Sequence, residues 1–535
     1  MNNKTICLIF LTAAFIASFV LSATGYGAVF CVKNPVEFQD ALNKAASNSE
    51  DDTIYVAEGT YNVTTTLTYN AVAGEIYTLS IIGAGAGCVG TGLPILDGGS
   101  SVQILNINTT GLVSDALAHI SVSGINFKNG ENSGDNGGGL AVLTKYANIA
   151  VQNSEFVSNG ACNGGGAYTS SSYGAITLTN NTFISNATST SSSTWGPSNG
   201  GGAYASSSYG AVTLTNNKFI SNATSTSTTY STEGGGAYAS SSYGTVTLTN
   251  NKFISNSLFC SYAYSRGGGA YASSSNGTVT LTNNIFSDRN VTSGNSGYGG
   301  GAYASSSNGT VTLTNNTFID NVSNSYGGGA YILLYNDPAK VNVYNNILWD
   351  NTAYKGGNDG DDLYVFSDQN GNGIGSPVNL FNNDLGLNAD FITAMSEDLV
   401  VTDTDFYSQD SNIQSNCLLK ADFHLQAGSP CIDTGNNNAP SLPSTDFEGC
   451  PRIINNVVDI GADEFWPILG NMNNGCSVDI SDVILVLRCA LDLPVDPYQC
   501  MPCGDINGDS KVDISDVILT LRMALGLDTL KQCTE

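Results

Sequence analysis

GGGAYASSSYGAVTLTNNKFISN, residues 200–222, is one unit of a repeat that fills the middle of the chain. Its triple glycine recurs at spacings of 27–36 residues, the range of one solenoid coil. Within the unit, apolar residues alternate with threonines, as Val212 and Leu214 do, and this alternation predicts a strand with one buried face. The triplets begin at Gly137, Gly164, Gly200, Gly234, Gly267, Gly299 and Gly327.

The alternation stops at an Asn-Asn pair and resumes out of phase at Phe219. A phase break at asparagine predicts a corner, because asparagine tolerates the left-handed conformation. Stacking the coils would place the asparagines in a ladder and the phenylalanines in a core stack. The triple glycine allows another sharp bend. The sequence therefore predicts a mainly β fold, a parallel β-helix whose variable Ser/Thr-rich loops emerge on one side.

Three sets of motifs resemble known β-helix families. The FISN runs resemble repeats of bacterial surface β-helix proteins, and residues 52–61 resemble the first strand of pectin-lyase-like right-handed β-helices. Residues 423–435 and 446–464 are similar to the closing region of the choice-of-anchor Q family. The resemblance implies a right-handed parallel β-helix solenoid over residues 28–380, a C-terminal region over 381–466 and an anchoring module beyond.

The N-terminus and the composition indicate an extracellular protein. Lys4 precedes an apolar run that ends near Leu21, and small residues follow, so residues 1–27 are predicted to be a signal peptide. An uncleaved anchor helix is the alternative, and no later apolar run is long enough for a transmembrane segment. The 535 residues carry a net charge of −28, which makes nucleic acid and anionic membrane poor partners. We expect secretion or display at the cell surface.

Thirteen cysteines fit an oxidising compartment, because twelve remain after loss of the signal peptide. Eight of them lie between Cys417 and Cys533, which predicts that disulfides hold the C-terminal part together. Cys500 and Cys503 have the spacing of a redox pair, but in a secreted protein structural disulfides are the favoured interpretation.

Residues 505–516 have the spacing of a twelve-residue Ca²⁺ loop. Side-chain oxygens stand at positions 1, 3, 5, 9 and 12, and a backbone carbonyl is expected at position 7. Clustered carboxylates repel one another unless a hard cation neutralises them, so a strong Ca²⁺ site is predicted. Its ligands would be Asp505, Asn507, Asp509, Lys511, Asp513 and Asp516.

A copy of this loop begins 34 residues earlier, at Asn471. It keeps carboxylates only at positions 9 and 12, and fewer charges mean weaker binding. We therefore expect one tight site and one that is weak or empty. The ligands of the weak site would be Asn471, Asn473, Ser477, Asp479 and Asp482.

Each loop precedes a run of apolar residues with helical periodicity. The residues are Ile514, Val517, Ile518, Leu521 and Leu525 after the second loop, and Ile480, Val483, Ile484, Leu487 and Leu491 after the first. Two loop–helix units over residues 467–535 resemble a type I dockerin, a duplicated module related to the EF-hand. The resemblance implies Ca²⁺ as cofactor and a cohesin-like or cell-surface partner, although the chain's own β-helix is an alternative partner. Leu521 and its counterpart Leu487 are predicted to be core. The residues implied to bind the partner are Ser515, Arg522, Ser481 and Arg488.

Two functions for the β-helix stay open at this stage. Near-identical coils and a column of tyrosines favour a non-catalytic protein that binds polysaccharide, although lateral packing is the preferred interpretation of these tyrosines. The alternative is a polysaccharide lyase or glycoside hydrolase, for which the fold alone is weak support. A groove with three or more acids and a basic residue would indicate an enzyme, whereas a flat Tyr/Ser/Thr face would indicate binding. The column is Tyr168, Tyr204, Tyr238, Tyr271, Tyr303 and Tyr331.

Acidic and basic residues are scarce in the repeats, and none of the acids is expected to recur in register. The best cluster joins Arg266, Asp288 and Arg289 on neighbouring coils, and chance placement is its favoured interpretation. With only two histidines in the chain, a histidine-rich zinc site is not visible.

Overall fold

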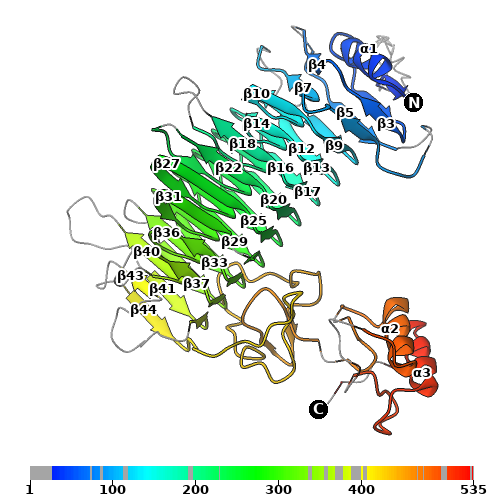
Figure 1. Cartoon of the computed structure of the whole chain (residues 1–535), viewed down its shortest axis with the longest axis vertical. Coiled ribbons are helices and arrows are strands. Elements are labelled where there is room, and N and C mark those ends of the chain that lie inside the picture. Colours follow the sequence, from blue (N-terminus) through cyan, green and yellow to red (C-terminus); the bar gives the residue numbers. More distant parts are fainter. Residues whose placement is uncertain are drawn as a thin grey trace, which may run out of the picture.

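The computed structural model shows a long parallel β-solenoid that ends in two packed helices (Figure 1). The structure describes residues 27–533 except 73–74, 85–87, 89, 112–118, 191–196, 228, 289, 335–339, 355–359, 368–377, 387–398, 402–406, 467, 474, 496–499, 501–502 and 530–532. Residues 1–26 of the predicted signal peptide lie outside the described residues, as does Arg289.

Four parallel sheets run along the described part of the solenoid, and each coil contributes a strand to most of them. The first, called the threonine sheet, contains β1 (Val29–Val32), β2 (Asp52–Val56), β5 (Leu79–Gly83), β8 (His119–Ser123), β12 (Asn148–Gln152), β16 (Ile176–Thr179), β20 (Val212–Thr215), β25 (Val246–Thr249), β29 (Val279–Thr282), β33 (Thr310–Thr314), β37 (Lys340–Tyr344), β41 (Val378–Phe381) and β44 (Tyr407–Asp410).

The phenylalanine sheet follows the corner of each coil. It contains β3 (Thr60–Asn62), β6 (Ile95–Asp97), β9 (Asn126–Lys128), β13 (Glu155–Val157), β17 (Thr182–Ile184), β21 (Lys218–Ile220), β26 (Lys252–Ile254), β30 (Ile285–Ser287), β34 (Thr317–Ile319), β38 (Ile347–Trp349) and β42 (Asp384–Leu385).

The tyrosine sheet follows the triple glycines. It contains β4 (Leu67–Asn70), β7 (Leu105–Asn108), β11 (Leu140–Thr144), β15 (Ala167–Ser171), β19 (Ala203–Ser207), β24 (Ala237–Ser241), β28 (Ala270–Ser274), β32 (Ala302–Ser306), β36 (Ala330–Leu334), β40 (Leu363–Ser367) and β43 (Leu399–Val401).

A fourth sheet occupies the segments that the sequence predicted as loops, and this prediction was wrong. Strands of successive coils pair here in parallel, because their backbone N–H and C=O groups point along the solenoid axis and bond those of the next coil. Its strands are β10 (Glu131–Asn136), β14 (Gly160–Asn163), β18 (Ala187–Thr190), β22 (Ala223–Thr226), β23 (Thr232–Glu233), β27 (Ser257–Arg266), β31 (Val291–Tyr298), β35 (Val322–Ser323) and β39 (Thr352–Ala353).

The Asn-Asn corner has the predicted left-handed residue and the predicted ladder. The first asparagine of each pair is left-handed, and the second forms the ladder. Asn216 takes φ 55°, while Asn217 is fully buried. The side-chain nitrogen of Asn217 donates to the Leu178 carbonyl at 2.8 Å and to the Asn251 side-chain oxygen at 3.0 Å. A second buried ladder runs through the asparagine that closes each FISN run, such as Asn222. These ladders satisfy backbone groups that a corner would otherwise leave unpaired.

Phenylalanine rings stack in the core as predicted, with neighbouring centroids 4.6–4.9 Å apart. The triple glycine also bends as predicted. Gly200 has φ 66°, and a Cβ on Gly201 would lie 2.3 Å from the Gly235 carbonyl oxygen in the next coil. Glycine is needed here both for the turn and for the close approach of coils. The stacked rings belong to Phe127, Phe156, Phe183, Phe219, Phe253, Phe286 and Phe318.

A helix that the sequence analysis missed covers the first end of the solenoid. In α1 (Pro35–Ala45), Asn34 is the N-cap and accepts from the Glu37 amide, and the proline stands at the first helical position. Phe38 and Leu42 are fully buried. The Asn-Pro pair was the available signal for this helix.

After β44 the chain turns back along the solenoid. Residues 411–466, called the return segment, contain only the short hairpin β45 (Ile453–Ile454) and β46 (Val457–Val458) among their described strands. The Asn283 side chain donates to the Thr445 carbonyl, and the Ala462 amide donates to the Thr317 hydroxyl. The buried Arg452 guanidinium donates to the Ala462 carbonyl at 2.8 Å. The return segment therefore lies on the phenylalanine sheet.

Five disulfides are present, and all eight cysteines from Cys417 to Cys533 are paired, as predicted. Cys500 and Cys503 pair with other partners, which confirms the structural interpretation. The twelve cysteines are not all paired, because Cys162 and Cys260 are free and buried. The bonds are Cys31–Cys88, Cys417–Cys431, Cys450–Cys476, Cys489–Cys500 and Cys503–Cys533.

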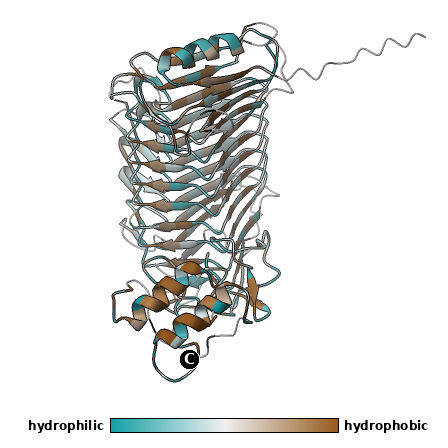
Figure 2. Cartoon of the chain, turned by 90° about the vertical axis from the view of Figure 1, so that its right-hand side faces the viewer, coloured by the Kyte–Doolittle hydropathy of each residue, from teal (hydrophilic) through white to brown (hydrophobic). Residues whose placement is uncertain are grey.

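Residues from 468 onward form the helical module. Its helices, α2 (Ile480–Ala490) and α3 (Ile514–Ala524), pack on each other around Val483, Val486, Val517 and Met523. Figure 2 shows both helices at the end of the chain opposite to α1. The Cys450–Cys476 disulfide ties this module to the return segment.

Candidate functional site

The second loop is held in shape by its own carboxylates. Asp505 accepts from the backbone amides of Gly508 and Ser510, both at 2.7 Å. Asp516, which is fully buried, accepts from Ile506, Asn507 and Asp513. The first and last of the predicted ligands are therefore fixed by the loop backbone.

Asp513 begins helix α3 as its N-cap. Its carboxylate accepts from the hydroxyl and the amide of Ser515, and these bonds lower the pKa of Asp513. A charged N-cap carboxylate stabilises the positive end of the helix. The Ser515 hydroxyl, implied by resemblance to bind a partner, thus has an internal acceptor in this structure.

The first loop repeats the same backbone contacts. Asp482 accepts from Met472, Asn473 and Asp479, at the positions that match those around Asp516. Burial raises the pKa of Asp482. Asn471 donates to the Gly475 carbonyl, while its side-chain oxygen is buried without a partner. The copy has the same backbone scaffold, although it lacks the carboxylates at positions 1 and 5.

Within the described residues, one group of three candidate ligands has its atoms within 4.8 Å of one another, and it is Asp384 with Cys417 and Cys431. Those cysteines form a disulfide, and burial raises the pKa of Asp384 to about 8. A neutral acid beside a disulfide is a poor metal site. The loop aspartates are not gathered to that degree.

An apolar stripe is exposed on each helix of the module. Ile514, Ile518 and Leu525 are 63%, 54% and 64% exposed, and the spacing places them on one side of α3. Leu521 is also exposed, so the prediction that it is core was wrong, and Leu487 is only half-buried. Of the residues that predicted the helix, Val517 is buried, and Thr520 and Met523 complete the core side of α3. The matching residues on α2 are Ile480, Ile484 and Leu491.

The two arginines implied to bind a partner lie near the C-terminal ends of the helices and have internal contacts. Arg488 donates to the Pro494 carbonyl at 2.8 Å, and Arg522 forms an ion pair with Asp528 at 2.7 Å. Both guanidinium groups remain largely exposed, as does Ser481. They therefore border the apolar stripes.

The predicted tyrosine column exists as a continuous stack. Neighbouring rings from Tyr168 to Tyr331 lie 4.5–5.2 Å apart and nearly parallel, which covers their faces. The side chains are half-buried or, at Tyr303 and Tyr331, buried. This geometry fits lateral packing better than stacking on sugars.

A second tyrosine column was missed and is far more exposed. Tyr146, Tyr173, Tyr209 and Tyr243 stack at 4.8–5.0 Å beside the threonine sheet. The last three are 48%, 51% and 57% exposed. The recurring Ser-Ser-Tyr-Gly was the available signal.

Acids do recur in register, contrary to the sequence analysis. Asp288, Asp320 and Asp350 each stand two residues after a paired core residue on neighbouring coils, all with positive φ. They border a cavity of about 600 Å³ together with Lys420, whose pKa is lowered by burial. Arg266 pairs instead with Glu233 at 2.7 Å.

A histidine on the return segment lies between two carboxylates. The His424 Nδ1 is 2.9 Å from Asp463 and its Nε2 is 3.3 Å from Glu448. Burial acts to lower the pKa of His424, but the bonds to these two acids outweigh it and raise the pKa to about 10. The histidine is therefore a cation at neutral pH.

Comparisons with known protein families, with curated proteins and with solved structures found no match for this chain. Among the described residues, no helix is both long and apolar enough to cross a membrane.

Proposed function

We propose that this chain is a secreted, right-handed β-helix protein that attaches to a partner outside the cell through a type I dockerin-like module. The observation that carries the proposal is the pair of exposed apolar stripes on α2 and α3. Monomeric proteins seldom leave such residues uncovered unless the surface binds something. The solenoid of the same chain does not cover the stripes, which supports a separate partner, such as a cohesin-like protein or another cell-surface component.

Calcium is the proposed cofactor of this module. The spacing of oxygens from Asp505 to Asp516 supports it, and so does the shared backbone scaffold of the two loops. The first and last aspartates of the second loop are already oriented by backbone amides. Binding of the ion would fix the start of α3 and with it the orientation of its apolar stripe.

A binding assay tests the attachment. Purified full-length protein is passed over immobilised type I cohesin domains in Ca²⁺ and in chelator. Replacing Ile514 and Ile518 by aspartate should weaken binding by about 30-fold or more, as loss of central apolar contacts does. The matched control is Val36→Asp, an exposed apolar residue of α1. Binding that is insensitive to both stripe substitutions and chelator would refute the proposal.

Polysaccharide is the proposed ligand of the solenoid, and the exposed tyrosines beside the threonine sheet support it. The phenol hydroxyls from Tyr146 to Tyr243 recur at the spacing of the coils, so a regular polymer lying along the axis would meet equivalent groups in turn. Hydroxyl-rich surfaces of this kind suit neutral sugars.

A polysaccharide-degrading enzyme is the second candidate, favoured by the cavity that Asp288, Asp320, Asp350 and Lys420 border. It contains the three acids and one basic residue that such chemistry requires. A half-buried lysine with a lowered pKa can act as a base in β-elimination. Incubation with polygalacturonate and Ca²⁺, followed at the absorbance of unsaturated products, tests it. Activity lost in Lys420→Ala would establish the enzyme, and no product from any acidic glycan would dismiss it.

A further inference from the structure

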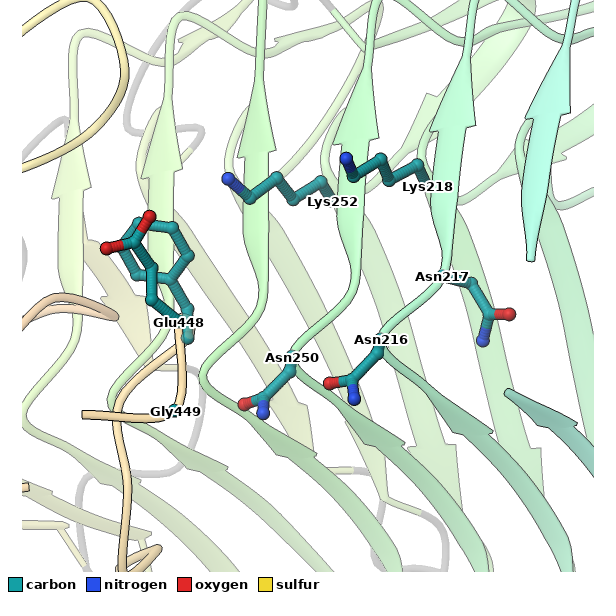
Figure 3. A pocket seen from close by; sticks show the side chains of 8 residues that line it. Asn216, Asn217, Lys218, Asn250, Lys252, Glu448 and Gly449 are labelled. Atoms are coloured by element: carbon teal, nitrogen blue, oxygen red, sulfur yellow. The ribbon is translucent and has the colours of Figure 1, made fainter. Parts of the chain in front are cut away.

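Two lysines lie side by side on the phenylalanine sheet. Lys218 begins β21 and Lys252 begins β26, and the two residues are paired in register. Neighbouring parallel strands lie about 4.8 Å apart, so the two ammonium groups are held close together. Both side chains extend in the same direction, toward Glu448 (Figure 3). Like charges in register are unfavourable unless something neutralises them.

The edge of the return segment forms a pocket together with this lysine pair. The next residues in the same register, Ile285 and Thr317, are covered by the return segment. The cover stops at Phe447, whose ring lies 4.4 Å from the Lys252 ammonium group. A cavity of about 310 Å³ remains beyond it, lined by the lysines, Glu448 and corner asparagines.

The acids near the cavity are shared between the lysine pair and a cationic histidine. Glu448 acts on Lys252 more strongly than the other acids do, yet it also bonds His424 at 3.3 Å. Asp422 and Asp463 act on Lys252 as well, and Asp463 bonds the same histidine at 2.9 Å. Burial lowers the pKa of Lys252, and the Lys218 charge lowers it further. In a chain with 17 basic and 45 acidic residues, two lysines sharing one cavity stand out as an anion-binding arrangement.

The cavity also contains neutral groups that can bond a hydroxyl. Asn250 lines it, and the side-chain oxygen of Asn250 is buried without a partner. Asn216 lies beside Asn250, and the two side chains project in parallel (Figure 3). An unsatisfied buried acceptor costs free energy that a hydroxyl donor would recover.

We infer that this pocket binds a small hydroxylated anion, with its carboxylate or sulfate group between the Lys218 and Lys252 ammonium groups and a hydroxyl donating to the Asn250 side-chain oxygen. The cavity is of the size that takes one small molecule or one terminal unit of a longer one. It shares no residue with the apolar stripes, the tyrosine columns or the aspartate cavity, so the inference stands apart from the proposed functions.

Calorimetry and ligand-observed NMR on the full-length protein test this site with three probes: D-glucuronate, D-glucose and inorganic sulfate. Glucuronate should bind, and glucose should bind at least about tenfold more weakly, because charge-assisted bonds contribute about 1.5–3 kcal/mol. Each of Lys218→Ala and Lys252→Ala should weaken glucuronate by about tenfold, and Lys218→Arg should retain binding. Asn250→Ala should weaken glucuronate and leave sulfate unchanged.

Lys128→Ala is the matched control, because Lys128 is an exposed lysine of β9 in the same sheet and outside the cavity. Lys218 is exposed, so its substitution should leave the unfolding midpoint unchanged and keep a folding defect from explaining any loss. Equal affinity for glucose and glucuronate, or an unchanged affinity in both lysine variants, would overturn the inference. Tighter binding of sulfate than of glucuronate would overturn the assignment of a hydroxylated ligand.

Discussion

The solenoid and the helical module both consist of repeated units. In the solenoid the equivalent residues of successive units contact one another, whereas in the module some equivalent residues remain exposed. In the solenoid each Asn217-type side chain lies against its own copies, so the repeated residue is fixed by its neighbours. In the module the repeated helices share a core of Val483 and Val517, while the repeated isoleucines remain exposed. Repetition stabilises the first region, whereas in the second it duplicates a surface.

This difference also governs which residues can change. Replacing one asparagine of a ladder breaks bonds to two coils, so the ladders tolerate little variation. The two loops kept the backbone contacts of Asp482 and Asp516 but not the side chains between them. The fold of the loop therefore does not depend on all the carboxylates of the proposed ligand set.

The largest effect is expected from breaking the ladder at Asn217. Its side chain bonds the Leu178 carbonyl and Asn251, and it accepts from Asn181. Asn217→Ala should lower the free energy of unfolding by about 3–5 kcal/mol, because several buried groups lose their partners. Urea unfolding measures this. The neighbouring Asn216→Gly is the control and should cost less than about 1 kcal/mol, since glycine adopts the same positive φ freely. Equal losses of unfolding free energy in the two variants would mean that the hydrogen bonds of the ladder do not stabilise the fold more than the left-handed corner residue does.

The next effect concerns the disulfides of the module, which has a small core and no ladders. Removing the Cys503–Cys533 bond by serine substitution should destabilise the module by about 3 kcal/mol. Calorimetry should show its transition moving to lower temperature while that of the solenoid stays in place. A shift of both transitions would show that the two regions unfold as one unit.

Calcium is expected to stabilise the module by about 2.7 kcal/mol when present at 100 times its dissociation constant. Asp505→Ala should abolish most of this gain, because Asp505 is the proposed first ligand of the charged loop and is fixed by the Gly508 and Ser510 amides. Asp479→Ala, in the eroded copy, should change it little. Melting curves with and without chelator measure both variants, and equal losses would contradict the expected inequality of the two loops.

The sequence predicted those features in which equivalent residues of neighbouring coils contact each other. The glycine bends, the asparagine ladder and the phenylalanine stack follow from a period and a phase break alone. The fourth sheet was missed because Ser/Thr-rich segments of variable length carry no apolar alternation. The position of the return segment on the solenoid could not be predicted from local sequence patterns, because residues in contact, such as Asn283 and Thr445, are 162 residues apart. For α3, the period showed that Ile514 and Leu525 share a side, but not whether that side faces the core.

A further effect is expected from pH within the return segment. The pKa of His424 is about 10 in the folded chain and near 6.5 when unfolded. The folded state therefore holds the proton more tightly, and this stability is complete below pH 6.5 and lost as pH rises through 10. Unfolding free energies measured between pH 7 and 10 should fall. In His424→Gln this contribution to the slope should disappear, and an unchanged slope would show that the histidine is not the group responsible.

The smallest effect is expected at the exposed tyrosines. Here the solenoid repeats an exposed side chain, as the helical module does. Tyr209 is 51% exposed, and its ring stacks on Tyr173 and Tyr243 with centroid distances of 4.9 and 4.8 Å. Tyr209→Ala should cost about 1 kcal/mol or less, because little apolar area and two ring contacts are lost. Tyr204→Ala, in the half-buried column, should cost more, since burial and stacking are both removed. If glycan-array binding falls in the Tyr209 variant while its stability holds, the exposed column is a binding surface. If stability falls equally in both variants and binding does not change, both columns serve only to hold the coils together.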